Sequence, residues 1–359
     1  MRRHWIPALF LTLALPGFSQ TAMTPEPVTP KEPAAILTAA SHFYDFKSPE
    51  LKPWHLKATY QLHDAYGVPT EQGIFEYWWV SPEIHRSSWT RPGAMRTDWF
   101  TAAGKHQSKT SGGSLRYFES DLSAMLFSPF PSRVDLDSGR MKLELKEVPA
   151  GSEKLECVIS SPQREVGGKL QLLDLGQAEY YCFDSSTLTL RVHRSGSITE
   201  EYSQIVKTQG RYLARKILVS VGEETLFTAS VDTIDWLKPD DEALTPSADA
   251  SQEEEAAAEQ SAASIPAGGG VKFGKVLTMT QPIYPIGAKA AHIQGDVLLS
   301  AVIGTDGRIR DLEVLASPSP LLTDSAIDAV KQWTYRPYEL NGKPVEVNTT
   351  IVVRFRLGN

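Results

Sequence analysis

Two cysteines, Cys157 and Cys182, are the most reactive side chains that this sequence offers. Both lie in strand-like segments, and the chain has no other thiol with which either could pair. An even pair in an oxidising compartment indicates one disulfide, and two buried free thiols are the alternative. A metal site is disfavoured because no His or Cys stands at ligand spacing near either cysteine.

Recognised catalytic arrangements are missing from the rest of the sequence. It contains no G-x-S-x-G, H-E-x-x-H, P-loop or G-x-G-x-x-G motif. The histidines occur singly, which suits surface or core imidazoles better than metal ligation. We therefore expect a binding protein rather than an enzyme, with no cofactor and no metal.

The charge balance excludes nucleic acid as a partner. The formal net charge is −7, and no cluster of Lys and Arg follows the first few residues. Phosphate recognition needs such a surplus of positive charge. The 359 residues are too many for one ordinary core, so two domains are expected.

The N-terminus has the order of a secretory signal peptide. Arg2 and Arg3 precede an apolar run from Trp5 to Phe18, and small or polar residues follow. The run is shorter than the about 20 residues that a membrane-spanning helix needs. We expect residues 1–19 to direct export to the periplasm, with an uncleaved inner-membrane anchor facing the periplasm as the alternative.

Composition divides the remaining chain into four segments. A Pro-rich leader is expected over 20–34, a β-rich periplasmic domain over 35–237 and a second domain over 271–359. The acidic stretch 238–270 between them has almost no large apolar side chain. Such a segment cannot offset its ordering entropy, so it predicts a disordered or partly helical linker.

Alternating patterns predict a mainly antiparallel sheet in the first domain, shaped as a curved sheet or half-barrel. Trp54, Leu56, Ala58, Tyr60 and Leu62 alternate along one such strand. Helices are expected over 32–46 and 118–127. Further strands are expected over 73–80, 84–91, 96–102, 141–148, 155–160, 169–175, 179–183, 188–193, 198–208, 212–221 and 225–236.

The order of strands and turns over 183–236 is similar to the closing meander of LolA-like periplasmic lipoprotein carriers. The resemblance implies an incomplete barrel that curls around helices and offers an apolar cavity to acyl chains. A generic curved sheet of unknown role is the alternative, because a fold alone does not establish a function.

The C-terminal segment predicts an α+β domain in the order α-β-β-α-β-β. A short helix over 284–291 opens at Pro285, and a strand over 292–303 places Val297, Leu299, Ala301 and Ile303 on one face. A return strand over 309–315 and an amphipathic helix over 323–333 follow. Strands over 335–339 and 345–357 complete an antiparallel sheet that packs on two helices.

Spaced landmarks across this segment resemble the C-terminal domain of TonB-type energy transducers. They occur in the family's order and are Pro282-Ile283-Tyr284-Pro285, Ile293-Gln294-Gly295-Asp296-Val297, Asp306-Gly307, the helix and strand residues Ala326, Ala329, Val330, Trp333, Tyr335 and Pro337, then Gly342-Lys343-Pro344-Val345, Val352 and Phe355. The resemblance spans nearly all of residues 271–359.

The resemblance implies binding by β-strand addition, in which a sheet edge receives an extended peptide. The expected partner is an outer-membrane TonB-dependent receptor or another envelope protein. The closing strand over 347–357 is the expected edge. The binding residues that the resemblance indicates are Tyr284, Pro285, Asn348, Thr350, Val352, Arg354 and Arg356.

The chain departs from the transducer pattern in two places. Its N-terminal apolar run is short, and an acidic linker and a large β-rich domain replace a long Pro-rich spacer. The leading hypothesis is a TonB-family periplasmic protein that docks an envelope partner, with a role in TonB-dependent transport. The alternatives are a carrier of a lipid or other hydrophobic ligand and a scaffold that contacts peptidoglycan.

Overall fold

The structure is a computed structural model that describes residues 31–110, 115–131, 136, 141–150, 153–166, 169–172, 178–252, 271–272, 276–340 and 343–357. The segments predicted as signal peptide and leader, 1–30, lie outside these residues, and so does most of the predicted linker, 253–270. No helix among the described residues is long and apolar enough to cross a membrane.

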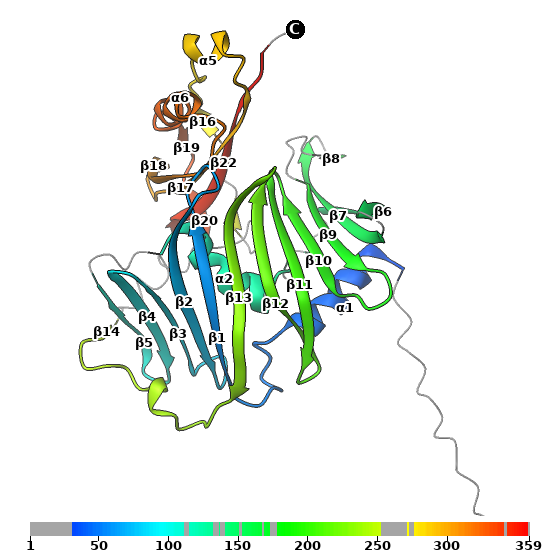
Figure 1. The fold of residues 1–359 in the computed structure, drawn as a ribbon, viewed down its shortest axis with the longest axis vertical. Helices are drawn as coiled ribbons and strands as arrows, with labels where there is room; N and C mark the ends of the chain where they lie inside the picture. Colours follow the sequence, from blue (N-terminus) through cyan, green and yellow to red (C-terminus); the bar gives the residue numbers. More distant parts are fainter. Residues whose placement is uncertain are drawn as a thin grey trace, which may run out of the picture.

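The N-terminal domain is one large antiparallel sheet with two helices on one of its faces (Figure 1). Its strands follow the order β14-β5-β4-β3-β2-β1-β13-β12-β11-β10-β9-β7-β6, with β8 paired to β7. Their bounds are β1 (Trp54–His63), β2 (Pro69–Trp79), β3 (His85–Arg91), β4 (Ala94–Thr101), β5 (Gly104–Lys109), β6 (Met141–Ala150), β7 (Glu153–Val166), β8 (Lys169–Leu172), β9 (Glu179–Asp184), β10 (Leu190–Ser195), β11 (Ile198–Thr208), β12 (Arg211–Val221), β13 (Glu224–Trp236) and β14 (Ser251–Gln252).

The predicted character of this domain, a mainly antiparallel curved sheet, is confirmed. The five alternating residues of β1, from Trp54 to Leu62, are all buried on one face. This face packs against helices α1 (Pro33–Tyr44) and α2 (Tyr117–Phe127). β1 pairs with β13, so strands from the beginning and the end of the domain's sequence lie side by side in one continuous sheet.

The start of the segment predicted as a disordered or partly helical linker, 238–252, has regular structure and packs on the folded domain. Residues 238–252 return to the outer face of the sheet and form the short helix η1 (Glu242–Leu244) and the strand β14. The carbonyl of Ala243 accepts hydrogen bonds from the side chains of Arg86 and Trp99. Partners supplied by the folded domain hold this acidic stretch in place, although its own composition offers no core.

The C-terminal domain is built around a three-stranded antiparallel sheet in the order β18-β17-β22. Its elements are β15 (Val271–Lys272), β16 (Val276–Thr278), α5 (Ile286–Ala290), β17 (Gly295–Ile303), β18 (Ile309–Ala316), α6 (Pro320–Val330), β19 (Thr334–Tyr335), β20 (Tyr338–Leu340), β21 (Lys343–Val345) and β22 (Val347–Phe355). The strand expected over 335–339 is split between β19 and β20, which pair with β16, β15 and β21 in two small separate sheets.

Both faces of the central sheet of the C-terminal domain contribute side chains to a hydrophobic core. One face, with Val297, Leu299 and Ile351, packs against α5 and α6. The other face, with Leu298 and Ala316, joins the core of the N-terminal domain. The two domains therefore share one hydrophobic core across this sheet.

Candidate functional site

Strand β22 forms one edge of the C-terminal sheet. It pairs in register with β17 from Val347 opposite Ile303 to Phe355 opposite Gly295. On its other side, no strand among the described residues pairs with it. An unpaired edge presents a row of free main-chain donors and acceptors, which is the requirement for adding a further strand.

The four site residues predicted within β22 share one face but differ in exposure. Asn348 and Arg354 are exposed, whereas Thr350 and Val352 are half-buried. Val352 packs against the core that the two domains share. This face is therefore exposed to solvent mainly at the two ends of the strand, because the core shared with the N-terminal domain contacts its middle.

Acidic Asp296 of β17 partly neutralises the two arginines at the end of β22. The guanidinium of Arg356 lies 2.6 Å from one oxygen of Asp296, and that of Arg354 lies 4.0 Å from the other. The side chains of both arginines are more than half exposed, so each ion pair contributes little stability. An acidic partner would have to displace Asp296 from these arginines.

Tyr284 and Pro285, the remaining predicted site residues, point to different places. The Tyr284 hydroxyl donates to the carbonyl of Ile293 at 2.6 Å, and its ring packs edge-on against Phe355 at 5.4 Å. Tyr284 therefore anchors the segment before α5 to the end of β22. Pro285 caps α5 and lines an open groove beside α6. The structure does not bring these two residues together with the polar residues of β22 into one cluster.

The two domains contact each other at β18, the strand on the opposite edge of the C-terminal sheet. The backbone N–H of Ser317 donates to the carbonyl of Ala65 in the turn between β1 and β2, at 3.1 Å. Glu313 of β18 lies beside the start of α2, where burial raises the pKa of its carboxyl. A hydrogen bond from the Tyr117 backbone and the charge of Arg116 oppose that rise. Sequence patterns gave no sign of this contact, because it joins residues far apart in the chain.

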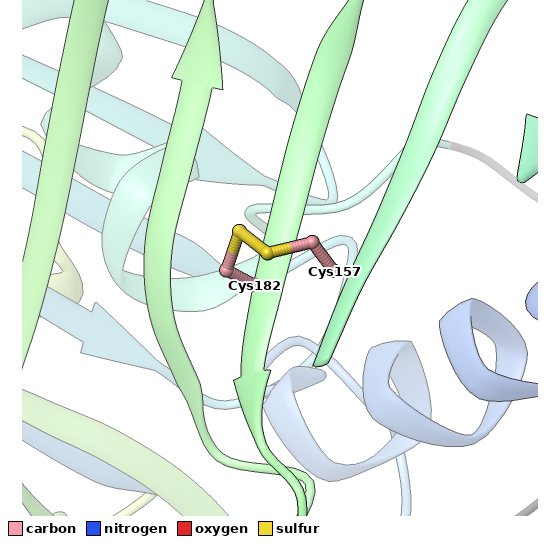
Figure 2. Close-up of a disulfide and its surroundings, with 2 residues drawn as sticks. All are labelled: Cys157 and Cys182. Atoms are coloured by element: carbon pink, nitrogen blue, oxygen red, sulfur yellow. A yellow bond between two sulfur atoms is a disulfide. The ribbon is translucent and has the colours of Figure 1, made fainter. Parts of the chain in front are cut away.

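The predicted disulfide between Cys157 and Cys182 is confirmed. The two cysteines lie directly opposite each other on the neighbouring strands β7 and β9, as Figure 2 shows. Both are buried in a small cluster with Leu155. The bridge therefore joins two strands near one end of the large sheet.

The concave side of the N-terminal sheet is filled by side chains of α1 and α2. Ile36, Leu37 and Phe127 of these helices are completely buried against the sheet. The carboxylate of Glu119 is also buried there and accepts hydrogen bonds from the Tyr60 hydroxyl at 2.5 Å and from Arg91 at 3.2 Å. Where the chain is described, this interior is a packed core with a satisfied polar centre.

Acidic residues Asp324 and Asp328, on one flank of α6, are candidate binding residues that the sequence prediction missed. They line the same groove as Pro285. Their spacing of four residues on a predicted helix was the available signal, since it places both carboxylates on one face. No group of three or more His, Cys, Asp or Glu residues in the described part of the chain is arranged to hold a metal ion.

Comparison with known proteins confirms the resemblance of the C-terminal domain. Residues 280–357 match the family model of the Gram-negative bacterial TonB protein C-terminal. Protein TonB of Vibrio cholerae is 34% identical over 83 residues, which cover 23% of this chain and 34% of that protein. Protein TonB of Pseudomonas aeruginosa is 36% identical over 84 residues, which cover 23% of this chain and 25% of that protein. The match thus spans about a third or less of these relatives.

The N-terminal region has structural neighbours in the LolA superfamily. A LolA superfamily protein from Nitrosomonas europaea aligns with 59% of this chain and 96% of its own, at 9% identity and a TM-score of 0.33. At that level of similarity, the neighbour carries no information about a ligand.

Proposed function

We propose that the protein is a TonB-family envelope protein whose C-terminal domain binds a partner by β-strand addition at β22. The observation that carries this proposal is that, among the described strands, β22 pairs on one side only, within a domain that matches the TonB C-terminal family. Strand addition takes its affinity from main-chain hydrogen bonds, and alternate side chains then select the partner. This is a binding function, and no catalytic step is part of it.

The proposed partner is an extended segment of an outer-membrane receptor or another envelope protein. Side chains of the partner would contact β22 at its exposed ends, Asn348 and Arg354. A carboxylate in the partner would compete with Asp296 for Arg354 and Arg356. We therefore expect binding to weaken at high salt, but to depend chiefly on the main chain.

Proline substitution tests the proposal by removing one main-chain donor from β22. In an antiparallel pair, neighbouring residues direct their N–H groups to opposite sides of the strand. The full-chain variants Thr349→Pro and Thr350→Pro therefore differ in the donor that they remove. One loses the N–H that donates to β17, and the other loses an N–H that points to the unpaired side of β22. The variant that keeps the circular dichroism and thermal midpoint of the wild type is the informative one.

Pull-down from an envelope extract, followed by identification of the captured protein, supplies the measurement. The informative proline variant should lose the partner, whereas valine at the same position should keep it, because valine preserves the main-chain N–H. Capture that survives the proline, or that is lost equally with valine, would reject strand addition at β22.

Export to the periplasm is part of the same proposal. It rests on the charged and apolar order of the first 19 residues and on the family of the C-terminal domain. The intact mass of the protein recovered from the periplasmic and membrane fractions tests it. A mature mass that lacks residues 1–19 would support a periplasmic docking protein and would reject direct coupling to an inner-membrane motor.

The carrier alternative has less support from the described residues. Helices α1 and α2 occupy the concave side of the sheet, where a half-barrel carrier would hold an acyl chain. Native mass spectrometry of the protein purified from its envelope would reveal a retained lipid. A stoichiometric lipid would revive this alternative, and its absence would leave the docking function as the single proposal.

A further inference from the structure

An open groove runs along one flank of α6, on a different face of the helix from the one that packs on the sheet. One wall is the segment before α5, with Ile283 and Pro285, and the other is α6 with Leu321, Asp324 and Asp328. The groove has a volume of about 390 Å³. This lies within the range of ordinary ligand and side-chain pockets, roughly 300–1,000 Å³. The strand pairing proposed for β22 does not use it.

Hydrogen bonds between the two walls hold the groove in shape. The indole N–H of Trp333 donates to the carbonyl of Thr280 at 2.9 Å, and the Ser325 hydroxyl donates to the carbonyl of Ile283. Tyr284, which follows Ile283 in the chain, turns inward and packs against the domain core. The groove is therefore formed before any ligand arrives, which reduces the entropic cost of binding.

Large apolar side chains surround the groove and remain in contact with solvent. Of the residues that line the groove, Ile283 is 82% exposed and Leu321 is 45% exposed, and Ile286, which follows Pro285 in the chain, is 86% exposed. Exposed aliphatic side chains that gather at one place typically mark an interaction surface. Because Tyr284 of the same segment is directed into the core, this exposure is specific to its neighbours and does not reflect a loose segment.

The charge within the groove is negative. Asp324 and Asp328 stand one turn apart on α6, and the lining residues include no Lys or Arg. Neither carboxylate lies in the first turn of α6, so an interaction with the helix dipole accounts for neither residue. A ligand with a cationic group beside apolar groups would complement both features.

We propose that this groove binds a short peptide segment of a partner protein that carries aliphatic side chains next to a Lys or Arg. The aliphatic groups cover Ile283 and Leu321, and the cation lies between Asp324 and Asp328. The two carboxylates would repel an anionic membrane surface, so a lipid bilayer fits the groove less well than a basic peptide. The site is independent of strand addition, because α6 and β22 offer different surfaces.

A selection from a random library of 12-residue peptides on the purified full chain tests this proposal without assuming a partner. A parallel selection uses the double variant Asp324→Asn/Asp328→Asn, and Ile283→Ser tests the apolar wall. Both variants change solvent-accessible groove residues and should keep the wild-type thermal midpoint. Asp240→Asn and Val206→Ser are matched controls, since both residues are exposed on the N-terminal domain.

Peptides enriched on the wild type should combine Lys or Arg with aliphatic residues. Their affinity, measured by fluorescence anisotropy, should fall at least about threefold in each groove variant and stay unchanged in the controls. Failure to enrich any peptide, enrichment of peptides without a cation, or equal binding to the groove variants would overturn the proposal. Two further outcomes would overturn the proposal if only the groove variants abolish them. Binding to vesicles with anionic lipid would assign the groove to a membrane, and self-association would assign it to a second copy of the chain.

Discussion

Leu298 and Leu299 are neighbours in β17, and each is buried in a different hydrophobic core. Leu298 packs in the core shared with the N-terminal domain, and Leu299 packs beneath α6. Successive side chains of a strand point to opposite faces, so β17 is the middle layer between the two cores. Substitutions at these two adjacent positions should therefore affect the docking of the domains and the folding of the C-terminal domain separately.

Truncation at these two positions should have different effects. Leu299→Ala removes a side chain from the C-terminal core and should cost about 2–5 kcal/mol of stability. Leu298→Ala should loosen the docking of the domains and leave the C-terminal fold in place. Hydrogen exchange at the amide of Ser317 reports docking, because this group donates across the interface to Ala65.

Protection of the Ser317 amide should fall in Leu298→Ala while the amides of β17 remain protected. In Leu299→Ala, protection should fall throughout the C-terminal domain. Equal loss of protection in both variants, across the same amides, would show that the two cores do not act separately.

Much of the N-terminal domain could be predicted because its strands alternate strictly in polarity. Trp54 to Leu62 revealed both the strand and its buried face, since one face contacts the helices and the other contacts solvent. Strand β5 was missed because it consists almost entirely of polar residues, GKHQSK, and takes its place from pairing with β4. The return of residues 238–252 was missed for the same reason, because its partners lie far away in the chain.

The C-terminal domain shows where local patterns stop being sufficient. Its buried face on β17 was predicted, but α6 begins at Pro320, three residues before the predicted start. Ser319 followed by Pro320 was a readable signal for a helix start, and the Ser319 side chain does cap the helix. The burial of Val352 had no such signal, because it depends on the neighbouring domain.

Loss of the buried carboxylate at Glu119 should be more harmful than loss of one of its hydrogen-bond donors. Glu119→Ala leaves the largely buried guanidinium of Arg91 with one fewer acidic partner and should cost about 3 kcal/mol or more. Tyr60→Phe removes a single donor and should cost about 1 kcal/mol. Urea unfolding of both variants measures the difference, and equal costs would contradict the central position assigned to Glu119.

Removal of the disulfide should destabilise the N-terminal domain. The bridge joins residues 25 positions apart, so the double variant Cys157→Ser/Cys182→Ser should lose about 2–4 kcal/mol. Changing both residues avoids an unpaired thiol. The control is the wild type with a reductant, which should unfold at the same urea concentration as the double variant. An unchanged midpoint in both would show that sheet pairing alone holds β7 and β9 together.

Asp121 of α2 should make the stability depend on pH. Burial and the nearby carboxylate of Glu200 raise the pKa of Asp121 from 3.8 to about 7. Since the folded state binds this proton more tightly, the stabilisation is complete below pH 3.8 and is lost as the pH rises through about 7. The stability of Asp121→Asn relative to wild type should therefore rise by up to about 4 kcal/mol between pH 4 and 8. A stability difference that stays constant with pH in urea titrations would refute this assignment.

The turn between β17 and β18 requires glycine at position 307 for two separate reasons. Gly307 has a φ of +76°, and a Cβ there would lie 1.9 Å from the carbonyl oxygen of Tyr335. Gly222 has a φ of +62° with nothing within 4 Å, so Gly222→Ala isolates the conformational cost of about 1 kcal/mol. Gly307→Ala should cost more, because β19 must also move away and the hydrogen bond from the Tyr335 N–H to Gly307 is broken. Urea unfolding with exchange at the Tyr335 amide distinguishes the two contributions. Equal costs for the two variants would mean that β19 yields freely, and that its contact with this turn does not stabilise the C-terminal domain.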